Sequence, residues 1–323
     1  MTFSQKVKDE IIKQKWTDEE SLSLIGGLLL SCGNLAIRKN SISFCLSSEF
    51  NQIIDFAKSL ILKEMPDVTF EEEVVKKNFK NKERTELSIN APYGEELLMR
   101  LGVLFLDKNG NRQICDIGDD SLRASENQTK AFLAGIFLGS GSISVPSSVD
   151  IDGLSASNKS SGYHMEWVTG NNNIAKTIME CLSALEILPK MVERYDSFVI
   201  YIKESDQIVQ MLGLFGAYTS LLDLENQKAS RQMINLINRQ ANCLQANYDK
   251  SVAAAVAQLE AIKIIEETVG LGELSTPLQE IAMLRKNNPK SSLGELVNLL
   301  NNRVSKGAVA QRLKKIIEIS KTL

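Results

Sequence analysis

The pattern of apolar and polar residues predicts short strands and amphipathic helices over the first two thirds of the chain. Ile42, Phe44 and Leu46 alternate with serines, which is the period-two pattern of a half-buried strand at 41–47. A helix follows at about 49–63, because its apolar residues fall on one helical face. The same reasoning predicts strands at about 67–75, 84–90, 142–146, 163–168, 189–194 and 197–202, and helices at about 94–105, 172–186 and from about 205. From 225 to 268 the pattern is helical throughout.

Two apolar helices indicate an internal duplication of this region. Residues 22–33 and 130–141 both carry small residues in the middle and end at a glycine suited to a helix C-cap. The two glycines, Gly33 and Gly141, lie 108 residues apart. A second pair of similar segments, 101–104 and 212–215, is separated by 111 residues. We therefore predict that the N-terminal part of the chain is a duplication. Its two αββαββα repeats lie at about 17–106 and 125–216.

Small residues in these two helices indicate how the copies associate. Helix backbones approach closely only where no large side chain holds them apart, and Gly26, Gly27, Ala134 and Gly135 provide such places. We predict that the two helices pair across a pseudo-twofold axis. The alternative is two ordinary core helices that share their composition by chance, which the repeated order of elements disfavours.

The last 48 residues predict three short helices. The first begins with Thr276 as N-cap and Pro277 at the first helical position, and it ends before 287–289. The second covers about 293–300, and the third runs from Ser305 to about 319. The apolar residues that can join these two helices are Leu293, Leu296, Val297, Leu300, Val309, Leu313 and Ile316. A short second helix, a tight turn and a basic third helix form the layout of a helix-turn-helix domain, whose third helix enters the major groove.

Charge is distributed unevenly along the chain. Residues 1–224 contain 23 Lys and Arg against 31 Asp and Glu, a net charge of −8, and residues 225–275 have a net charge of −1. Residues 276–323 contain nine Lys and Arg against three Glu, a net charge of +6. We therefore expect the C-terminal helices to bind double-stranded DNA. The DNA-binding residues that we predict are Ser292, Arg303, Ser305, Lys306, Gln311, Arg312, Lys314 and Lys315. The alternative is a basic helical bundle that binds a protein or only solubilises the end of the chain.

Composition argues against several other classes of protein. Apolar residues make up 43% of the 323 residues, yet no apolar run reaches the roughly 18–20 residues of a membrane span. The first fifteen residues lack the apolar core of a secretory signal, so we expect a cytoplasmic protein. The five cysteines contain no CxxC pair, and the single histidine, His164, sits in a strand-like run where a structural role is expected. We expect no cofactor, no metal and no small-molecule substrate.

One stretch resembles the nonapeptide of the LAGLIDADG homing endonucleases. It is Leu133–Gly141, with the sequence LAGIFLGSG, and Ile25–Gly33 is its counterpart in the first copy. The resemblance implies an acidic metal ligand at the eighth position of each copy, where this chain has Cys32 and Ser140. The acid two positions earlier is also missing. We therefore expect no catalytic residues and no nuclease activity.

The combination of a degenerate LAGLIDADG-like half and a helix-turn-helix resembles the WhiA family of sporulation and cell-division regulators. The stretches that carry the resemblance are 3–10, 131–144, 163–166, 238–243, 246–247 and 304–313. The resemblance implies a nucleoid-associated DNA-binding transcriptional regulator, linked to cell division, chromosome segregation or sporulation. The order of the predicted elements divides the chain into an α+β domain at 1–222, a helical linker at 223–272 and an all-α helix-turn-helix domain at 273–323. The segment 147–162 departs from the family pattern and is interpreted as a flexible inserted loop.

Two alternative functions stay open at this point. One is a metal-dependent endonuclease of the LAGLIDADG type, which would need carboxylates outside the motif. The other is a protein-docking scaffold, in which the acidic N-terminal half binds a protein partner and the basic helices are accessory.

Overall fold

The computed structural model describes residues 2–38, 41–77, 82–146 and 162–323. They belong to two compact units, Met1–Ala229 and Ser230–Leu323. The predicted inserted loop falls almost entirely on 147–161, which lie outside the described residues. Among the residues that are described, no helix has the length and hydropathy needed to cross a membrane.

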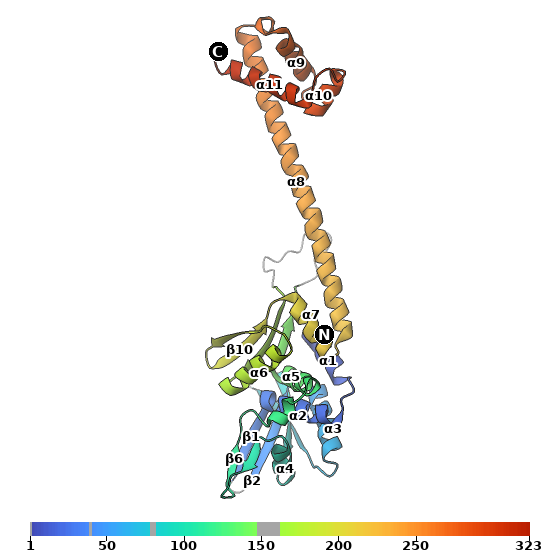
Figure 1. Ribbon diagram of the computed structural model, residues 1–323, viewed down its shortest axis with the longest axis vertical. Helices are drawn as coiled ribbons and strands as arrows, with labels where there is room; N and C mark the ends of the chain where they lie inside the picture. The colour runs from blue at the N-terminus through green and yellow to red at the C-terminus, as the bar shows by residue number, and fades with distance from the viewer. Residues whose placement is uncertain (1, 39–40, 78–81, 147–161) are drawn as a thin grey trace. The chain divides into compact units, whose positions relative to one another are not determined.

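The first unit contains two copies of one αββαββα repeat (Figure 1). The first copy comprises α2 (Asp18–Cys32), β1 (Gly33–Arg38), β2 (Ser41–Ser48), α3 (Asn51–Glu64), β3 (Glu71–Lys77), β4 (Lys82–Ile89) and α4 (Tyr93–Arg100). The second comprises α5 (Glu126–Ser140), β7 (Gly141–Ser144), β8 (His164–Thr169), α6 (Asn172–Ala184), β9 (Lys190–Arg194), β10 (Ser197–Ile202) and α7 (Ser205–Leu214). The elements follow the same order in both copies, so the predicted α+β fold with a duplicated half is confirmed.

Each copy forms one four-stranded antiparallel sheet. The strand order is β1-β2-β4-β3 in the first sheet and β7-β8-β10-β9 in the second, so corresponding strands take corresponding places. In the first sheet Phe44 lies opposite Ile89 and Leu46 opposite Leu87, and all four side chains are buried. Successive side chains of a strand point to opposite faces, so each sheet turns one face to the core and the other outward. The predicted alternation of 41–47 is thereby confirmed.

The central helices α2 and α5 cross at their small residues, as predicted. A Cβ atom added to Gly27 would lie 2.2 Å from the carbonyl oxygen of Phe132, so the two backbones are nearly in contact. A Cβ atom added to Gly135 would lie at the same distance from the carbonyl oxygen of Leu24. Both pairs of equivalent residues are 108 positions apart, which is the offset of the repeat. The pseudo-twofold pairing is therefore confirmed residue by residue.

Gly33 and Gly141 are the C-cap residues of α2 and α5, as predicted, but neither is left-handed. Gly33 has φ −90° and ψ 150°, and Gly141 has φ −79° and ψ 148°, so both have extended backbones. Their role is steric, because a Cβ atom would lie 2.3 Å from the Leu29 carbonyl oxygen at Gly33 and 2.2 Å from the Phe137 ring at Gly141. Each glycine starts the next strand directly, and β1, which the sequence pattern did not predict, follows from this geometry.

The predicted helix at 94–105 ends earlier than expected. α4 stops at Arg100, and Gly102 adopts a left-handed φ of +64° that lets its N–H reach the Met99 carbonyl. The chain then forms the hairpin of β5 (Leu104–Leu106) and β6 (Arg112–Ile114) and the short helix η1 (Asp120–Arg123). Three-residue strands are too short to produce a recognisable alternation, so the sequence pattern did not reveal the hairpin.

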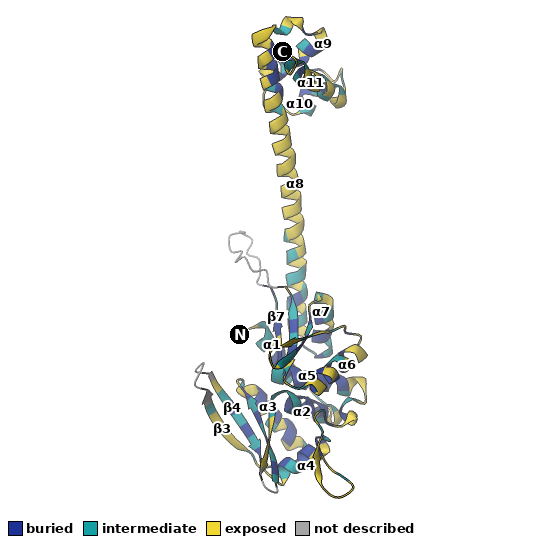
Figure 2. Ribbon diagram, turned by 90° about the vertical axis from the view of Figure 1, so that its left-hand side faces the viewer, coloured by how far each residue is buried: buried dark blue, intermediate teal, exposed yellow. Residues whose placement is uncertain are grey.

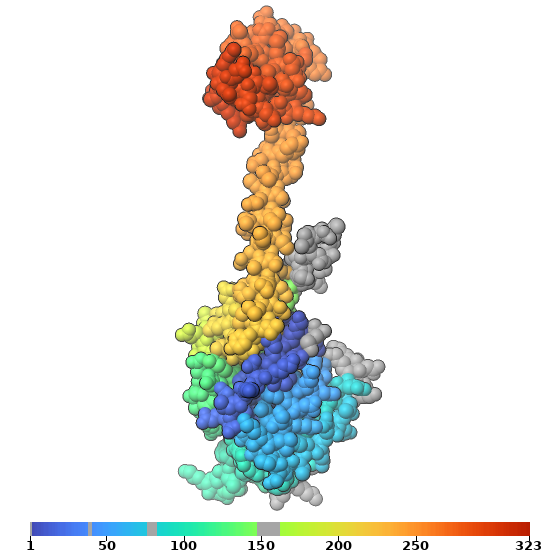
Figure 3. All heavy atoms as spheres, turned by 90° about the vertical axis from the view of Figure 1, so that its right-hand side faces the viewer, coloured from blue at the N-terminus to red at the C-terminus, as the bar shows by residue number. Residues whose placement is uncertain are grey.

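An N-terminal helix, α1 (Phe3–Ile12), lies on the surface of the first unit (Figure 3) and packs against α3 of the first repeat and α5 and β7 of the second. Thr2 closes a capping box at its start, and Val7 and Ile11 are fully buried. The carboxylate of Glu10 accepts hydrogen bonds from the backbone N–H groups of Thr219 and Ser220, at 2.8 and 2.9 Å. These residues begin α8 (Tyr218–Thr268), so α1 fixes the first turn of that helix.

The second unit contains the rest of α8, the turn η2 (Leu271–Glu273), α9 (Thr276–Asn287), α10 (Leu293–Leu299) and α11 (Lys306–Ser320). Its core includes Ile262, Ile281, Leu296, Leu313 and Ile316. The three predicted C-terminal helices are present, but the N-cap of α9 is Ser275 and not Thr276, because Pro277 occupies the second helical position. Proline fits there as well, since that N–H has no helical partner in any case.

Candidate nucleic-acid interface

The two helices of the predicted helix-turn-helix begin at serine caps. The Ser305 hydroxyl accepts a hydrogen bond from the N–H of Ala308 at 3.2 Å and so caps α11. The Ser292 hydroxyl accepts from the N–H of Glu295, whose carboxylate accepts in return from the Ser292 N–H at 2.6 Å. Both serines are also exposed. Each predicted DNA-binding serine therefore has a structural role that is independent of DNA.

The tight turn between α10 and α11 is formed by two consecutive asparagines. Asn301 and Asn302 have φ of 53° and 56°, and the Asn302 N–H reaches back to the Val297 carbonyl at 3.1 Å. Asparagine is the residue other than glycine that most readily adopts this left-handed conformation. We predicted a turn here without identifying these residues, although the Asn-Asn pair is the signal for it.

Packing in the second unit determines which face of α11 is available. Val309, Leu313 and Ile316 are fully buried, so one side of the helix is held against the core. This leaves Lys306, Gln311 and several neighbouring side chains at the surface. The predicted DNA-binding residues that are exposed are Ser292, Arg303, Ser305, Lys306, Gln311, Lys314 and Lys315, and Arg312 is half-buried. All eight belong to α10, α11 and the turns beside them.

Several of these cations have no internal counter-charge. Among the described residues, no carboxylate forms an ion pair with Arg303, Lys306, Arg312 or Lys315, and Lys314 lies 4.0 Å from Glu318. Unpaired cations keep their full charge for a phosphate. Lys306, Gln311, Lys314, Lys315 and the half-buried Arg312, with Arg303 in the preceding turn, form what we call the exposed basic face of α11. This surface is electrostatically suited to DNA.

Not every basic residue of the tail contributes to this face. Arg285 is 2% exposed, and its guanidinium donates to the Ser291 carbonyl at 2.6 Å, which connects the end of α9 to the start of α10. Lys286 is paired with Glu266 at 2.6 Å. The net charge of +6 counted from the sequence thus overstates the charge that is free to meet a ligand.

The degenerate motif lies in a polar cavity of about 500 Å³ in the first unit. Cys32 and Ser140, predicted to occupy equivalent places, both line this cavity, together with Arg84 and Glu86 from β4. The Cys32 thiol donates to the Leu28 carbonyl at 3.3 Å, and the Ser140 hydroxyl donates to the Ile136 carbonyl at 3.4 Å. Each side chain is thus bonded to its own helix one turn earlier.

This pair does not fit the divalent metal that the fold family implies. Burial raises the pKa of the Cys32 thiol to about 11, so the group is neutral at physiological pH. A neutral thiol and a hydroxyl lack the anionic oxygens that Mg²⁺ prefers. Within the described residues, no group of three or more His, Cys, Asp or Glu is placed to hold a metal ion.

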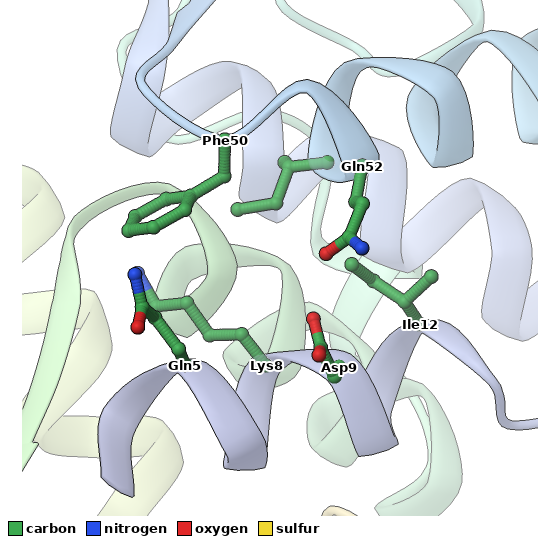
Figure 4. Close-up of a pocket in the computed structure, with 7 residues that line it drawn as sticks. Gln5, Lys8, Asp9, Ile12, Phe50 and Gln52 are labelled. Carbon is green, nitrogen blue, oxygen red and sulfur yellow. The ribbon is translucent and has the colours of Figure 1, made fainter. Parts of the chain in front are cut away.

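A buried lysine that sequence reasoning missed, Lys8, lies beside Phe50 in a small pocket (Figure 4). The Lys8 ammonium donates to the Leu138 carbonyl at 3.0 Å and lies 5.7 and 5.6 Å from the ring centroids of Phe50 and Phe137. Burial lowers the pKa of Lys8 to about 8. Its charge lies at the C-terminal end of α5, where the helix dipole favours a cation, so Lys8 connects α1 to that helix.

The outward faces of the sheets carry charges of both signs: Arg84 shares the face of Glu86 in the first sheet, and Lys190 and Glu166 both pair with Tyr201 in the second. Glu73 on β3 lies directly opposite Glu86 on β4 in the first sheet. In the second sheet the predicted strand around His164 is present as β8, and the His164 ring is 2.9 Å from the Glu166 carboxylate and stacked on Tyr201. Glu73 and Glu86 repel each other, and this pair would also repel a phosphate group close to it.

Family models match both parts of the chain. The model described as WhiA C-terminal HTH domain matches residues 237–320, and the WhiA LAGLIDADG-like domain matches 129–151 and 152–234. A relative named "Probable cell division protein WhiA" from Clostridium perfringens is 34% identical over 325 residues, covering 100% of this chain and 98% of the relative. A protein of the same name from Clostridium acetobutylicum is 35% identical over 327 residues, with the same coverage.

A solved structure shows the same fold over the whole chain. It is the crystal structure of full-length DUF199/WhiA from Thermatoga maritima, which matches with a TM-score of 0.58 at 22% identity, over 100% of this chain and 99% of that one. With the full-length sequence relatives, this shows that the chain belongs to the WhiA family.

Proposed function

We propose that this chain is a DNA-binding regulator of transcription that acts in cell division, chromosome segregation or sporulation-type development, on the nucleoid in the cytoplasm. The exposed basic face of α11 is the observation that carries the proposal. The relatives named as probable cell division proteins support the biological process. We further propose that the protein does not cleave DNA.

The geometry of α11 suits insertion into a major groove. Val309, Leu313 and Ile316 hold its apolar side against the core. The exposed side therefore has a fixed orientation in which it could enter a major groove. Gln311 and Arg312 have the amide and guanidinium groups that read base edges. Lys306, Lys314, Lys315 and Arg303 would contact phosphates, and Ser305 lies at the N-terminus of α11, where backbone N–H groups favour an anion. Ser292 would contribute its exposed hydroxyl, because its N–H already donates to Glu295.

Removal of three cations from this face tests the proposal. We expect the full-length variant K306A/R312A/K315A to bind genomic DNA fragments that co-purify with the protein on the order of 100-fold more weakly, at fixed salt. A matched control, K13A/K108A/K190A, removes the same charge from exposed positions of the first unit. Gel shifts in which both triple variants lose the same affinity, or neither loses any, would contradict the proposal.

The first unit serves, in this proposal, as a platform for a protein partner and not as a reader of DNA. The net charge of −8 and the opposed pair of Glu73 and Glu86 support this role. The neutral Cys32 and Ser140 support the absence of nuclease activity. Incubation with supercoiled plasmid and Mg²⁺ tests that absence, and clean nicking that copurifies with the protein through several columns would overturn it.

A further inference from the structure

An apolar stripe runs along the middle of α8. It consists of Met233, Ile237, Ala241, Leu244, Tyr248 and Val252, which we call the α8 stripe. Its large members are exposed: 67% for Met233, 54% for Ile237, 70% for Leu244, 66% for Tyr248 and 44% for Val252. Figure 2 shows this part of α8 as exposed. Six apolar positions aligned on one face of an exposed helix form a surface that favours association.

The spacing of the stripe follows the pitch of a nearly straight helix. Met233 is followed eleven residues later by Leu244, Ile237 by Tyr248, and Ala241 by Val252. Eleven residues correspond to three helical turns at about 3.67 residues per turn. The stripe therefore stays on one side of α8 over about five turns, as a face for a second helix requires.

We propose that the α8 stripe binds the same stripe of a second copy of this chain, with the two helices antiparallel. The stripe is symmetric about a point between Asn242 and Cys243. A twofold axis through that point places Met233 against Val252, Ile237 against Tyr248, and Ala241 against Leu244 of the second copy. All six apolar positions then meet apolar positions, as a closed twofold interface demands.

The sizes of the side chains favour this direction. In the antiparallel pairing each large side chain meets a smaller one, so the packing volume stays even along the interface. In a parallel pairing Ala241 would face Ala241 and leave a void, whereas Tyr248 would face Tyr248 and be overcrowded. Only the antiparallel register combines full apolar pairing with even packing.

Charge is also compatible with self-association. The charged residues of this stretch are Arg231, Arg239, Asp249 and Lys250. At 100° per residue, Arg239 and Lys250 project from the side of α8 opposite the stripe. Two copies can therefore approach through their stripes without bringing like charges into contact.

The α8 stripe continues toward the part of α8 that packs in the core of the second unit. About three turns after Val252, the same helix buries Ala261, Ile262 and Ile265 in the core of the second unit. The exposed side chains of one copy cover several hundred Å², so a pair buries on the order of 1,000 Å², at the lower end of specific interfaces. We expect a weak dimer, with a dissociation constant on the order of micromolar.

Sedimentation of the full chain between about 1 and 100 µM tests the association. The variant I237E/L244E places two charges in the stripe, and we expect it to raise the dissociation constant at least about 100-fold. The control N235E/A246E adds the same charge to exposed positions on the other side of α8. We expect that control to dimerise like the unmodified chain. A chain that is monomeric at 100 µM, or equal losses in both variants, would overturn the proposal.

Disulfide trapping tests the direction of the pairing. In a C243S background, which removes the exposed native thiol, proteins carrying Ile237→Cys and Tyr248→Cys are mixed and oxidised gently. Antiparallel pairing predicts a mixed disulfide between the two variants, and preferential disulfides within each variant would overturn it. If I237E/L244E instead weakens DNA binding while sedimentation is unchanged, the stripe contacts nucleic acid and the proposal is wrong. The proposed role of α11 is independent of all these outcomes.

Discussion

Gly27 and Gly135 each face the backbone of the other's helix at the same distance. A Cβ atom on either glycine would lie 2.2 Å from a carbonyl oxygen of the facing helix, that of Phe132 or of Leu24. Backbone atoms cannot rotate out of the way as side chains can, so the added methyl group forces the helices apart. We predict that Gly135→Ala lowers the free energy of unfolding by about 3 kcal/mol or more, measured by urea denaturation.

A glycine in α7 provides the matched control. A Cβ atom on Gly213 would meet the Leu221 side chain at 3.5 Å, an ordinary van der Waals distance. Gly213→Ala should therefore leave stability unchanged or raise it by about 0.5–1 kcal/mol, because alanine restricts the unfolded chain. If both substitutions had the same effect, the close helix crossing would not be the cause.

The buried ammonium of Lys8 predicts an unusual dependence of stability on pH. Its pKa is about 8 in the folded protein, against an ordinary value of 10.5. Between these two values the unfolded chain retains a proton that the folded chain has released, so stability rises with pH. Below pH 8 both states are protonated, and the cost of burying the charge is present in full.

Comparison with Lys8→Met isolates this contribution. The stability of the unmodified protein relative to Lys8→Met should rise by roughly 1 kcal/mol per pH unit between pH 8 and 10, measured by urea denaturation. Lys6→Met is the control, because the Lys6 side chain is 51% exposed. Parallel stability curves for the unmodified protein and Lys8→Met would show that the Lys8 pKa is not lowered.

Local patterns predicted the repeated architecture, whereas features that depend on distant residues escaped prediction. The alternation around Phe44 and the glycines of α2 and α5 are local signals, and they led to the correct strand at β2 and to the pairing of α2 with α5. β1 was missed because its apolar residues Leu35 and Ile37 are 36% and 65% exposed and do not mark a core face. Lys8 lies among charged residues, and its partner Leu138 is 130 positions away. The predicted DNA-binding residues of α11 are on one structural element, and their contacts with DNA stay a prediction.

The N-cap of α11 allows its structural role to be separated from DNA binding. Ser305→Ala removes the hydrogen bond to the Ala308 N–H, and we predict a loss of about 1 kcal/mol in the free energy of unfolding. Ser305→Asp keeps a capping oxygen but places a negative charge next to the proposed phosphate contacts. It should therefore retain stability and lower DNA affinity on the order of 10-fold, measured by fluorescence anisotropy. Equal DNA affinity in Ser305→Asp and the unmodified chain would place the DNA away from this helix end.

Restoring carboxylates at the degenerate motif tests why the cavity does not suit a metal. Cys32 and Ser140 line one cavity and hold equivalent places in the two copies, so C32D/S140D would bring two carboxylates into it. Without metal their mutual repulsion should lower the melting temperature. With about 10 mM Mg²⁺ and a dissociation constant of about 1 mM, metal binding would stabilise the variant by roughly 1.4 kcal/mol.

The isosteric variant C32N/S140N separates charge from shape in this test. Its amides occupy the same volume as the carboxylates but bind Mg²⁺ poorly, so we expect no change in melting temperature on addition of metal. The unmodified protein should behave in the same way, because its thiol and hydroxyl are neutral. A shift in C32D/S140D alone would assign the loss of metal affinity to these two substitutions. A shift in the unmodified protein would instead require ligands outside the motif and would reopen the question of nuclease activity.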